Sequence, residues 1–225
     1  MLRAVAREWL SWVYPFVCEL CGRGGRDGCH VCPDCRGSFV PVEPAALPSF
    51  EEARAVYVNM GSLRDLLLAF KYGGAVHLAG SFAQMMAEAV LGNPHWFGGK
   101  KRLIVPVPMH RGKQARRGYN QAQELAVLLG EELGWPYAGV LKRLPDTLPQ
   151  ASLSREQRLR HARKIYAADE KRMKRSPVRG RDVLLVDDVF TTGATADSCA
   201  RLLLRSGAAS VCVLTLARTH HAWRG

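Results

Sequence analysis

The segment that most constrains the fold of this 225-residue chain is residues 183–216. It opens with an uninterrupted apolar run, Val183–Val186, which is typical of a parallel strand covered on both faces. After a polar loop, apolar residues recur at helical spacing up to Gly207: Ala196, Cys199, Ala200 and Leu203. A further apolar run, Val211–Leu216, follows. Strand, helix and strand in this order predict a parallel α/β unit.

The polar loop of this unit indicates a phosphate ligand. Open α/β sheets bind ligands at the carboxyl ends of their strands, where the next helix presents free N–H groups. Hydroxyl donors and a permissive glycine add to this cradle: Thr191, Thr192, Gly193, Ala194 and Thr195. The loop lacks the Gly-Lys-Ser/Thr of a Walker A motif and the GxGxxG of a dinucleotide site.

Two aspartates, Asp187 and Asp188, stand where the first strand is expected to end. Adjacent residues of an extended chain point to opposite faces, so a close dyad that shares one proton is not expected. Carboxylates beside a phosphate cradle can accept hydrogen bonds from ribose hydroxyls or help to hold Mg²⁺. Helix capping would explain only one of the two acids. We therefore expect the pair to contact a phosphorylated sugar.

Upstream of this unit, strand and helix patterns alternate, which predicts a parallel sheet flanked by helices. The expected elements are a strand at Ala55–Met60, a helix opened by a capping box of Ser62 and Asp65, a helix at Leu78–Leu91, a strand at Leu103–Val107 and, after a basic loop, a helix at Asn120–Leu133. We assign this body to residues 49–225. Residues 1–48 would hold an N-terminal helix, a metal module and a stiff linker marked by Pro41, Pro44 and Pro48.

Five of the seven cysteines crowd into residues 18–35, which argues against a disulfide framework and for a reducing, cytoplasmic location. Two CxxC pairs suit tetrahedral zinc: Cys18, Cys21, Cys32 and Cys35. Cys29-x2-Cys32 is also a CxxC, and His30 could donate a nitrogen, so either could replace one of these ligands. A redox CxxC would need one pair on a strand-to-helix turn, which a Gly-rich segment with two pairs does not resemble.

The positive charge is local. The chain carries 32 Lys and Arg against 20 Asp and Glu, a net charge of +12. Lys100–Asn120 contains seven basic residues and no acidic one, and Gly139–Arg181 contains thirteen basic and four acidic residues. Within the second group, the clusters Arg155–Lys164 and Lys171–Arg175 hold more cations than one small ligand can use, although a solvated basic face is the plain explanation for an isolated charge run. The concentration favours contacts with nucleic-acid phosphates by Arg158, Arg160, Arg163 and Lys164.

No apolar run reaches the ~18–20 residues that a membrane-spanning helix needs, so membrane insertion is not expected.

The sequence VLLVDDVFTTGAT, Val183–Thr195, resembles the phosphoribosyl pyrophosphate (PRPP) signature of type I phosphoribosyltransferases. Further segments resemble the ComF/GntX family in order: Cys18–Cys35, Lys71-Tyr72, Val105–Pro108, Arg117–Gln121 and the region of Thr147, Gln150 and Arg158. His161 departs from the family, which often has Asn there.

The resemblance implies a type I phosphoribosyltransferase-like parallel sheet with a small N-terminal four-cysteine zinc module, and a connection with DNA uptake in natural transformation. It implies that Asp187 and Asp188 contact the ribose hydroxyls and that Thr191–Thr195 hold the 5′-phosphate. Pyrophosphate would lie against the loop after Val105–Pro108, formed by Pro108, Met109 and His110. A mobile loop, Arg111–Gly118, would close over it with Arg111, Lys113, Arg116 and Arg117.

Two functional hypotheses follow. One is an enzyme that transfers the phosphoribosyl group with Mg²⁺, largely by electrostatic positioning. The other is a non-catalytic competence protein that binds single-stranded DNA, uses the pocket as a sensor or retains it as a relic, and works with other proteins of the competence machinery. The sequence assigns neither an acceptor base nor an oligomeric state.

Overall fold

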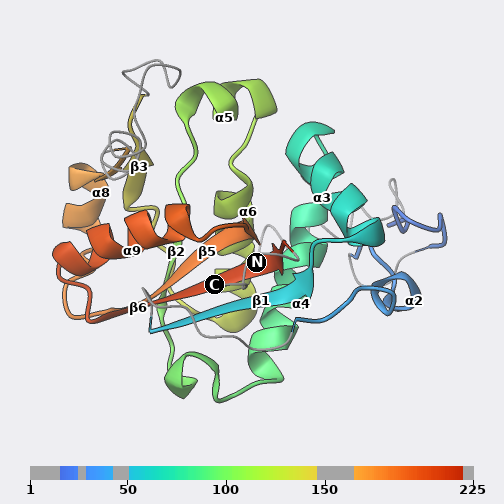
Figure 1. Ribbon diagram of the computed structural model, residues 1–225, viewed down its shortest axis with the longest axis horizontal. Coiled ribbons are helices and arrows are strands. Elements are labelled where there is room, and N and C mark those ends of the chain that lie inside the picture. Colours follow the sequence, from blue (N-terminus) through green and yellow to red (C-terminus); the bar gives the residue numbers. More distant parts are fainter. Residues whose placement is uncertain (1–15, 25–28, 43–50, 146–164, 220–225) are drawn as a thin grey trace, which may run out of the picture.

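A parallel four-stranded sheet forms the centre of the computed structural model (Figure 1), which describes residues 16–24, 29–42, 51–145 and 165–219. Its strands lie in the order β1 (Glu52–Val58), β6 (Ser210–Arg218), β5 (Asp182–Phe190) and β2 (Leu103–Pro106). All three pairings are parallel. The predicted α/β class is thereby confirmed.

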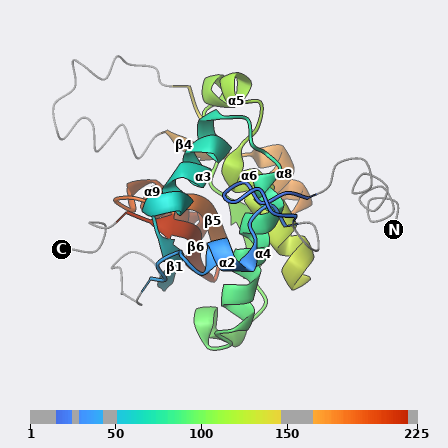
Figure 2. The same ribbon diagram turned by 90° about the vertical axis from the view of Figure 1, so that its right-hand side faces the viewer.

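Helices cover both faces of the sheet, as Figures 1 and 2 show. On one face lie α3 (Gly61–Tyr72), α4 (Leu78–Leu91) and α6 (Gln121–Leu133), and on the other lies α9 (Ala194–Arg205). Successive residues of β5 point to opposite faces, so Leu184 and Val186 join the first core and Val183 and Leu185 the second. No helix among the described residues is both long and apolar enough to cross a membrane.

The central βαβ unit follows the prediction closely, with one correction. The buried side chains of α9 are the predicted apolar set: Ala196, Cys199, Ala200 and Leu203. Strand β5, however, does not end at the aspartates. Its ladder with β6 continues through Asp187 opposite Thr215 to Phe190 opposite Arg218. The acids therefore lie within the strand, because β6 is long enough to keep pairing with it.

Elements upstream agree with the predicted type but not always with the predicted start. Helix α4 has the predicted bounds, and α6 begins after Asn120, whose side chain accepts a hydrogen bond from the Ala122 N–H. The predicted capping box of α3 is wrong, because the N-cap is Met60 and no side chain caps it. Ser62 is already inside the helix.

The basic segment after β2, expected to be a loop, is a short helix, α5 (Arg111–Arg117), that projects from the body in Figure 1. The His110 side chain accepts a hydrogen bond from the Gly112 N–H at its start, and Gly118 ends it in the left-handed region at φ 84°. A glycine C-cap is a usual helix end, whereas histidine is not among the preferred N-cap residues, so the start of α5 had no standard signal in the sequence.

A two-stranded antiparallel hairpin, β3 (Leu141–Arg143) and β4 (Tyr166–Ala168), lies beside α9 and precedes α8 (Glu170–Arg175). The Leu144 N–H donates to the Ile165 carbonyl at 2.7 Å, so the chain on either side of residues 146–164 is held together. The predicted DNA contacts lie outside the described residues, as does His161: Arg158, Arg160, Arg163 and Lys164.

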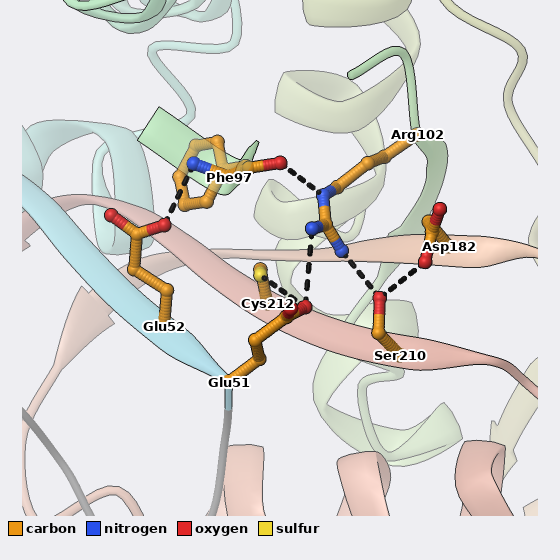
Figure 3. Close-up of polar contacts among 7 residues, drawn as sticks. All are labelled: Glu51, Glu52, Phe97, Arg102, Asp182, Ser210 and Cys212. Carbon is orange, nitrogen blue, oxygen red and sulfur yellow. Dashed lines mark hydrogen bonds and ion pairs between the residues drawn. The ribbon is translucent and has the colours of Figure 1, made fainter. Parts of the chain in front are cut away.

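A polar network fastens the amino ends of the strands (Figure 3). Arg102, only 2% exposed, donates to the Phe97 carbonyl at 3.0 Å in the 3-10 helix η1 (Trp96–Gly99), to Ser210 Oγ at 2.7 Å and to Glu51 Oε2 at 3.2 Å. Ser210 in turn donates to Asp182 Oδ1 at 2.5 Å. Hydrogen bonds to charged groups of this kind are among the stronger ones.

The seven basic residues of Lys100–Asn120 do not form one surface. Strand β2 divides the segment, so Lys100, Lys101 and Arg102 lie at the amino end of the sheet, whereas Arg111–Arg117 follow its carboxyl end. The Arg102 guanidinium is fully engaged in these buried hydrogen bonds. It therefore cannot contact a ligand at the carboxyl ends of the strands.

The N-terminal module contacts the body directly. After α2 (Pro33–Arg36), the chain runs antiparallel along β1, where the Val58 N–H donates to the Val40 carbonyl at 2.7 Å. Arg36 pairs with Glu88 of α4 at 2.5 Å and donates to Tyr57 Oη at 2.9 Å. The division of the chain near residue 48 stays a prediction.

Candidate functional site

A cavity of about 200 Å³ opens at the carboxyl ends of β2 and β5. Its walls include seven of the predicted ligand contacts: Pro108, Met109, Lys113, Arg117, Asp187, Asp188 and Thr195. Eight further residues complete them: Lys71, Tyr72, Val107, Asn120, Gln121, Ala122, Arg143 and Tyr166. The cavity lies where open α/β sheets bind their ligands.

The two aspartates both line this cavity but engage different groups. Asp188 is buried, and its Oδ1 lies 3.1 Å from the Lys71 ammonium at the end of α3. The Asp188 backbone N–H donates to Asp187 Oδ1 at 2.9 Å. Neither contact is a proton shared between the carboxyls, in line with the expectation from their adjacent positions.

Of the two carboxyls, Asp187 is the one whose ionised form is destabilised by its surroundings. Burial first, and then the charge of Asp188, raise the pKa of Asp187 well above its ordinary value, although the Asp188 N–H and Lys71 oppose this. An empty pocket therefore favours a protonated Asp187. Ribose hydroxyls or a cation would stabilise the ionised form, so ligand and proton compete at this carboxyl.

The predicted phosphate loop lines a second, smaller cavity of about 40 Å³ that shares Asp187 and Thr195 with the first. Thr191 and Gly193 also line it, whereas Thr192 and Ala194 are exposed. The free N–H groups of the first turn of α9 point toward this end of the helix.

Gly193 is required by its position. Its φ of 77° lies in the left-handed region, and a Cβ there would lie 2.7 Å from Cζ of Phe190. The Ala194 N–H donates to Thr192 Oγ1 at 3.4 Å, which fixes the turn into α9. Only glycine permits this tight entry into the helix.

On the opposite wall, α5 contributes cations. Lys113, although exposed, and the half-buried Arg117 line the cavity, whereas Arg111 and Arg116 on the same helix do not, and His110 is used as its cap. The predicted basic set is thus divided by helical periodicity, which a loop prediction could not anticipate.

Arg117 has unused hydrogen-bonding capacity. Its guanidinium lies 4.6 Å from the centre of the Tyr72 ring and donates to Gln121 Oε1 at 3.2 Å. Its Nε is buried without a hydrogen-bond partner among the described residues. Leaving this donor buried without a partner is costly, and the rest of the Arg117 guanidinium lies on the cavity wall, where it suits an anionic ligand.

Sequence reasoning gave no ligand role to six polar or aromatic residues of the wall: Lys71, Tyr72, Asn120, Gln121, Arg143 and Tyr166. Lys71-Tyr72 and Asn120-Gln121 belong to motifs already visible in the sequence. Tyr119 Oη and Gln121 Nε2 both donate to the Phe70 carbonyl, the latter at 3.2 Å, which joins the end of α3 to the start of α6. Arg143 and Tyr166 arrive through the β3–β4 hairpin, for which no motif was available.

Away from this cavity, the four predicted zinc ligands converge. The sulfurs of Cys18, Cys21, Cys32 and Cys35 all lie within 4.8 Å of one another, and the Cys21 and Cys32 sulfurs are 3.7 Å apart. Four thiolates about 2.3 Å from a tetrahedral zinc would be about 3.8 Å apart. The Cys32 N–H lies 3.4 Å from Cys18 Sγ, and although burial opposes it, backbone N–H groups of Cys32, Leu20 and Cys21 lower the pKa of Cys18. The donors fit zinc.

The two alternative ligands face elsewhere. Cys29 Sγ donates to Gln84 Oε1 of α4 at 2.6 Å, and the His30 ring packs edge to face against the His77 ring with centroids 4.6 Å apart. Neither belongs to the four-sulfur group. The structure thus favours the predicted set.

The family model of the phosphoribosyl transferase domain matches residues 87–224, which include β2, β5, β6 and the phosphate loop. Most of the cavity wall lies in this matched region.

Curated relatives extend the match to most of the chain. The DNA utilization protein YhgH of Salmonella typhimurium is 30% identical over 217 residues, covering 90% of both chains. Competence protein ComFC of Bacillus subtilis is 29% identical over 95% of this chain and 82% of its own. Competence protein F of Haemophilus influenzae is 30% identical over 76% and 74%. The chain belongs to the ComF family of proteins with a phosphoribosyl transferase domain.

Proposed function

We propose that this protein binds PRPP in the cavity between β5 and α5 and serves DNA uptake or utilisation. One observation carries the proposal: two carboxylates, Asp187 and Asp188, face the same cavity as two cations, Lys113 and Arg117. PRPP carries both complementary chemistries, because its ribose hydroxyls donate hydrogen bonds and its pyrophosphate accepts them.

In this proposal each part of the ligand has its own partners. The ribose hydroxyls donate to the aspartates, and the 5′-phosphate lies at the start of α9 beside Thr191 and Thr195. Pyrophosphate contacts Pro108 and Met109 and accepts hydrogen bonds from Lys113 and from the guanidinium of Arg117, both of which line the cavity. The carboxylates with the phosphate oxygens form a donor set that suits Mg²⁺, which would neutralise pyrophosphate charge.

Transfer of the phosphoribosyl group would break the bond between ribose C1 and pyrophosphate and form a bond from C1 to an acceptor. Lys113 and Arg117 would stabilise the charge that develops on the departing pyrophosphate. Turnover is tested by following pyrophosphate release from PRPP and Mg²⁺ in the presence of single nucleobases. Release with any acceptor supports an enzyme, and binding without release supports a sensor.

Binding is tested by titration calorimetry of PRPP with Mg²⁺. We expect binding to the unmodified protein and none to Asp187→Asn with Asp188→Asn, because two ribose acceptors lose their charge. Asp65→Asn, the same change at an exposed position of α3, is the matched control and should bind normally. Equal affinity in all three proteins would refute the site.

A second function, binding of single-stranded DNA, is supported by where the hairpin lies. The β3–β4 hairpin joins the chain on both sides of the basic residues 146–164, and its Arg143 and Tyr166 line the cavity. Three relatives carry the names DNA utilization protein, Competence protein ComFC and Competence protein F. We propose that the basic residues of Gly139–Arg181 contact DNA phosphates next to the PRPP site, and that competence proteins are partners.

Salt dependence tests this proposal. Replacing Arg158, Arg160, Arg163 and Lys164 by Gln should weaken binding of a fluorescent single strand and lower the slope of log affinity against log salt by up to about 3, since each phosphate contact contributes about 0.7. The control removes equal charge from exposed positions elsewhere: Arg64, Lys100, Lys101 and Arg205. Equal effects of the two sets would leave only nonspecific attraction and contradict a defined surface.

A further inference from the structure

A second group of metal-ligating side chains lies at the joint between the cysteine module and the body. Glu19 and His30 come from the module, and His77 immediately precedes α4. One ligand atom of each lies within 4.8 Å of the others. The group has no cysteine in common with the four-sulfur cluster, and neither PRPP nor DNA binding uses it.

The geometry of the three side chains is compact. His77 Nε2 lies 2.7 Å from Glu19 Oε1, and the His30 and His77 rings meet edge to face with centroids 4.6 Å apart. A plain hydrogen bond between His77 and Glu19 accounts for two of the three residues. The His30 imidazole is held by other contacts, an edge-to-face packing against Phe16 with centroids 5.2 Å apart and a hydrogen bond to the Val17 backbone. These contacts keep one of its ring nitrogens within 4.8 Å of the ligand atoms of Glu19 and His77.

The backbone holds the module residues in place. The Glu19 N–H donates to the His30 carbonyl at 3.0 Å, and the His30 N–H donates to Ser81 Oγ of α4 at 2.7 Å. Cys29 is fixed to Gln84 of the same helix. These bonds preorganise Glu19 and His30 opposite His77, and preorganisation lowers the cost of binding.

We propose that Glu19, His30 and His77 form a second, open site for a first-row transition ion such as Zn²⁺. Two imidazole nitrogens and one carboxylate oxygen are a common protein ligand set for zinc, with a fourth position left to water. Ligands about 2.1 Å from the ion would lie about 3.4 Å apart, within a short side-chain movement of the present positions. His77 and Glu19 are 41% and 43% exposed, so the ion and its water have access.

Such an ion would clamp the module to α4, against which it lies in Figure 2. Bonds from Glu19 and His30 to the ion, and from the ion to His77, would cross the joint. Because binding occurs only when the module is docked, metal affinity would add to docking stability. This site is independent of the proposed PRPP function.

Co²⁺ titration of the full-length protein tests the proposal, because cobalt bound to thiolates has an intense charge-transfer absorption that cobalt on imidazole and carboxylate lacks. We expect two equivalents to bind, only one of them with thiolate absorption. His77→Ala should bind one equivalent and keep the thiolate absorption. Gln84→Ala, which changes the same joint without removing a ligand, should still bind two.

Glu19→Gln provides a second variant, because it can keep a hydrogen bond to His77 but loses the anionic ligand. It should lower affinity for the second equivalent at least tenfold while the far-ultraviolet circular dichroism stays unchanged. Binding of one equivalent by the unmodified protein, or of two by His77→Ala, would overturn the proposal. So would a thermal destabilisation by His77→Ala of equal size with and without metal, which would mean a metal-free polar contact only.

Discussion

The Lys71 ammonium lies 3.1 Å from Oδ1 of Asp188, which joins the end of α3 to the middle of the candidate site. Both side chains are largely buried, with exposed fractions of 22% and 11%. In the ligand-free protein, therefore, one carboxylate of the pair is already neutralised by the protein itself. A ligand that approaches Asp188 must either share Lys71 or displace it.

Replacing this lysine should destabilise the protein. In Lys71→Gln the largely buried Asp188 carboxylate loses its counter-charge, and we expect the free energy of unfolding to fall by about 2 kcal/mol. Urea unfolding at pH 7 measures this. Lys113→Gln, an exposed lysine on α5, is the control and should change stability by less than about 0.5 kcal/mol. No loss in Lys71→Gln would mean that the ion pair contributes nothing.

Asp187 should make the stability of the ligand-free protein fall with rising pH. Its folded-state pKa is raised, first by burial, so between its unfolded pKa of about 4 and the raised value the folded protein holds the extra proton. Stability contributed by this group is therefore lost as pH rises through that window. Asp187→Asn should flatten the decline and be the more stable protein at pH 8.

Unfolding midpoints at intervals from pH 5 to pH 8 test the Asp187 prediction. Added PRPP with Mg²⁺ should reverse the order of stability, because an ionised aspartate accepts hydrogen bonds from ribose hydroxyls more strongly than the neutral amide of asparagine does. A steeper decline in Asp187→Asn than in the unmodified protein would show that the sign is wrong.

Gly193 is expected to tolerate no side chain. Gly193→Ala adds a left-handed φ cost of about 1–2 kcal/mol and a contact of 2.7 Å with Phe190. Gly180 has φ 70° and nothing within 4 Å of the position that a Cβ would take. Gly180→Ala therefore carries the cost of the left-handed backbone without the steric contact. Thermal unfolding should show a larger loss for Gly193→Ala than for Gly180→Ala, and PRPP affinity should fall only in the former. Equal losses would remove the steric explanation.

The four-cysteine site is tested by single Cys→Ser variants. Cys21→Ser should lose thiolate-bound metal and destabilise the module, because a structural zinc site supplies folding energy. Cys29→Ser should keep the metal, since Cys29 contacts Gln84 and stands outside the sulfur cluster. Elemental analysis with cobalt spectra measures both. Retention of thiolate-bound metal by Cys21→Ser would require a different ligand set.

Much of the fold was predictable because the spacing of apolar residues in the sequence reflects which side chains each helix or strand buries. The apolar spacing of α9 in the sequence is its buried face in the structure, and the bounds of α4 were predicted correctly. Strand ends were not, since β5 continues past Asp187 for as long as β6 pairs with it. The predicted capping box at Ser62 was wrong because the helix already begins at Gly61, so Ser62 stands inside it and cannot be its N-cap.

The candidate site was only half predictable. Residues close in sequence to the phosphate loop carry a motif, and most of them line one of the two cavities. Lys71 reaches the site from α3, and Tyr166 from a hairpin, so their places depend on tertiary packing. Arg102 was counted with the basic residues near the ligand site, but it lies in a buried network. Charge alone cannot distinguish such a network from a binding surface.

The most direct test of the PRPP site is a crystal structure of the protein soaked with PRPP and Mg²⁺. We predict that the ribose hydroxyls contact Asp187 and Asp188, the 5′-phosphate lies at the start of α9, and the pyrophosphate contacts Lys113 and Arg117. A cavity that stays free of PRPP at saturating concentration, or a ligand bound away from the two aspartates, would contradict the account.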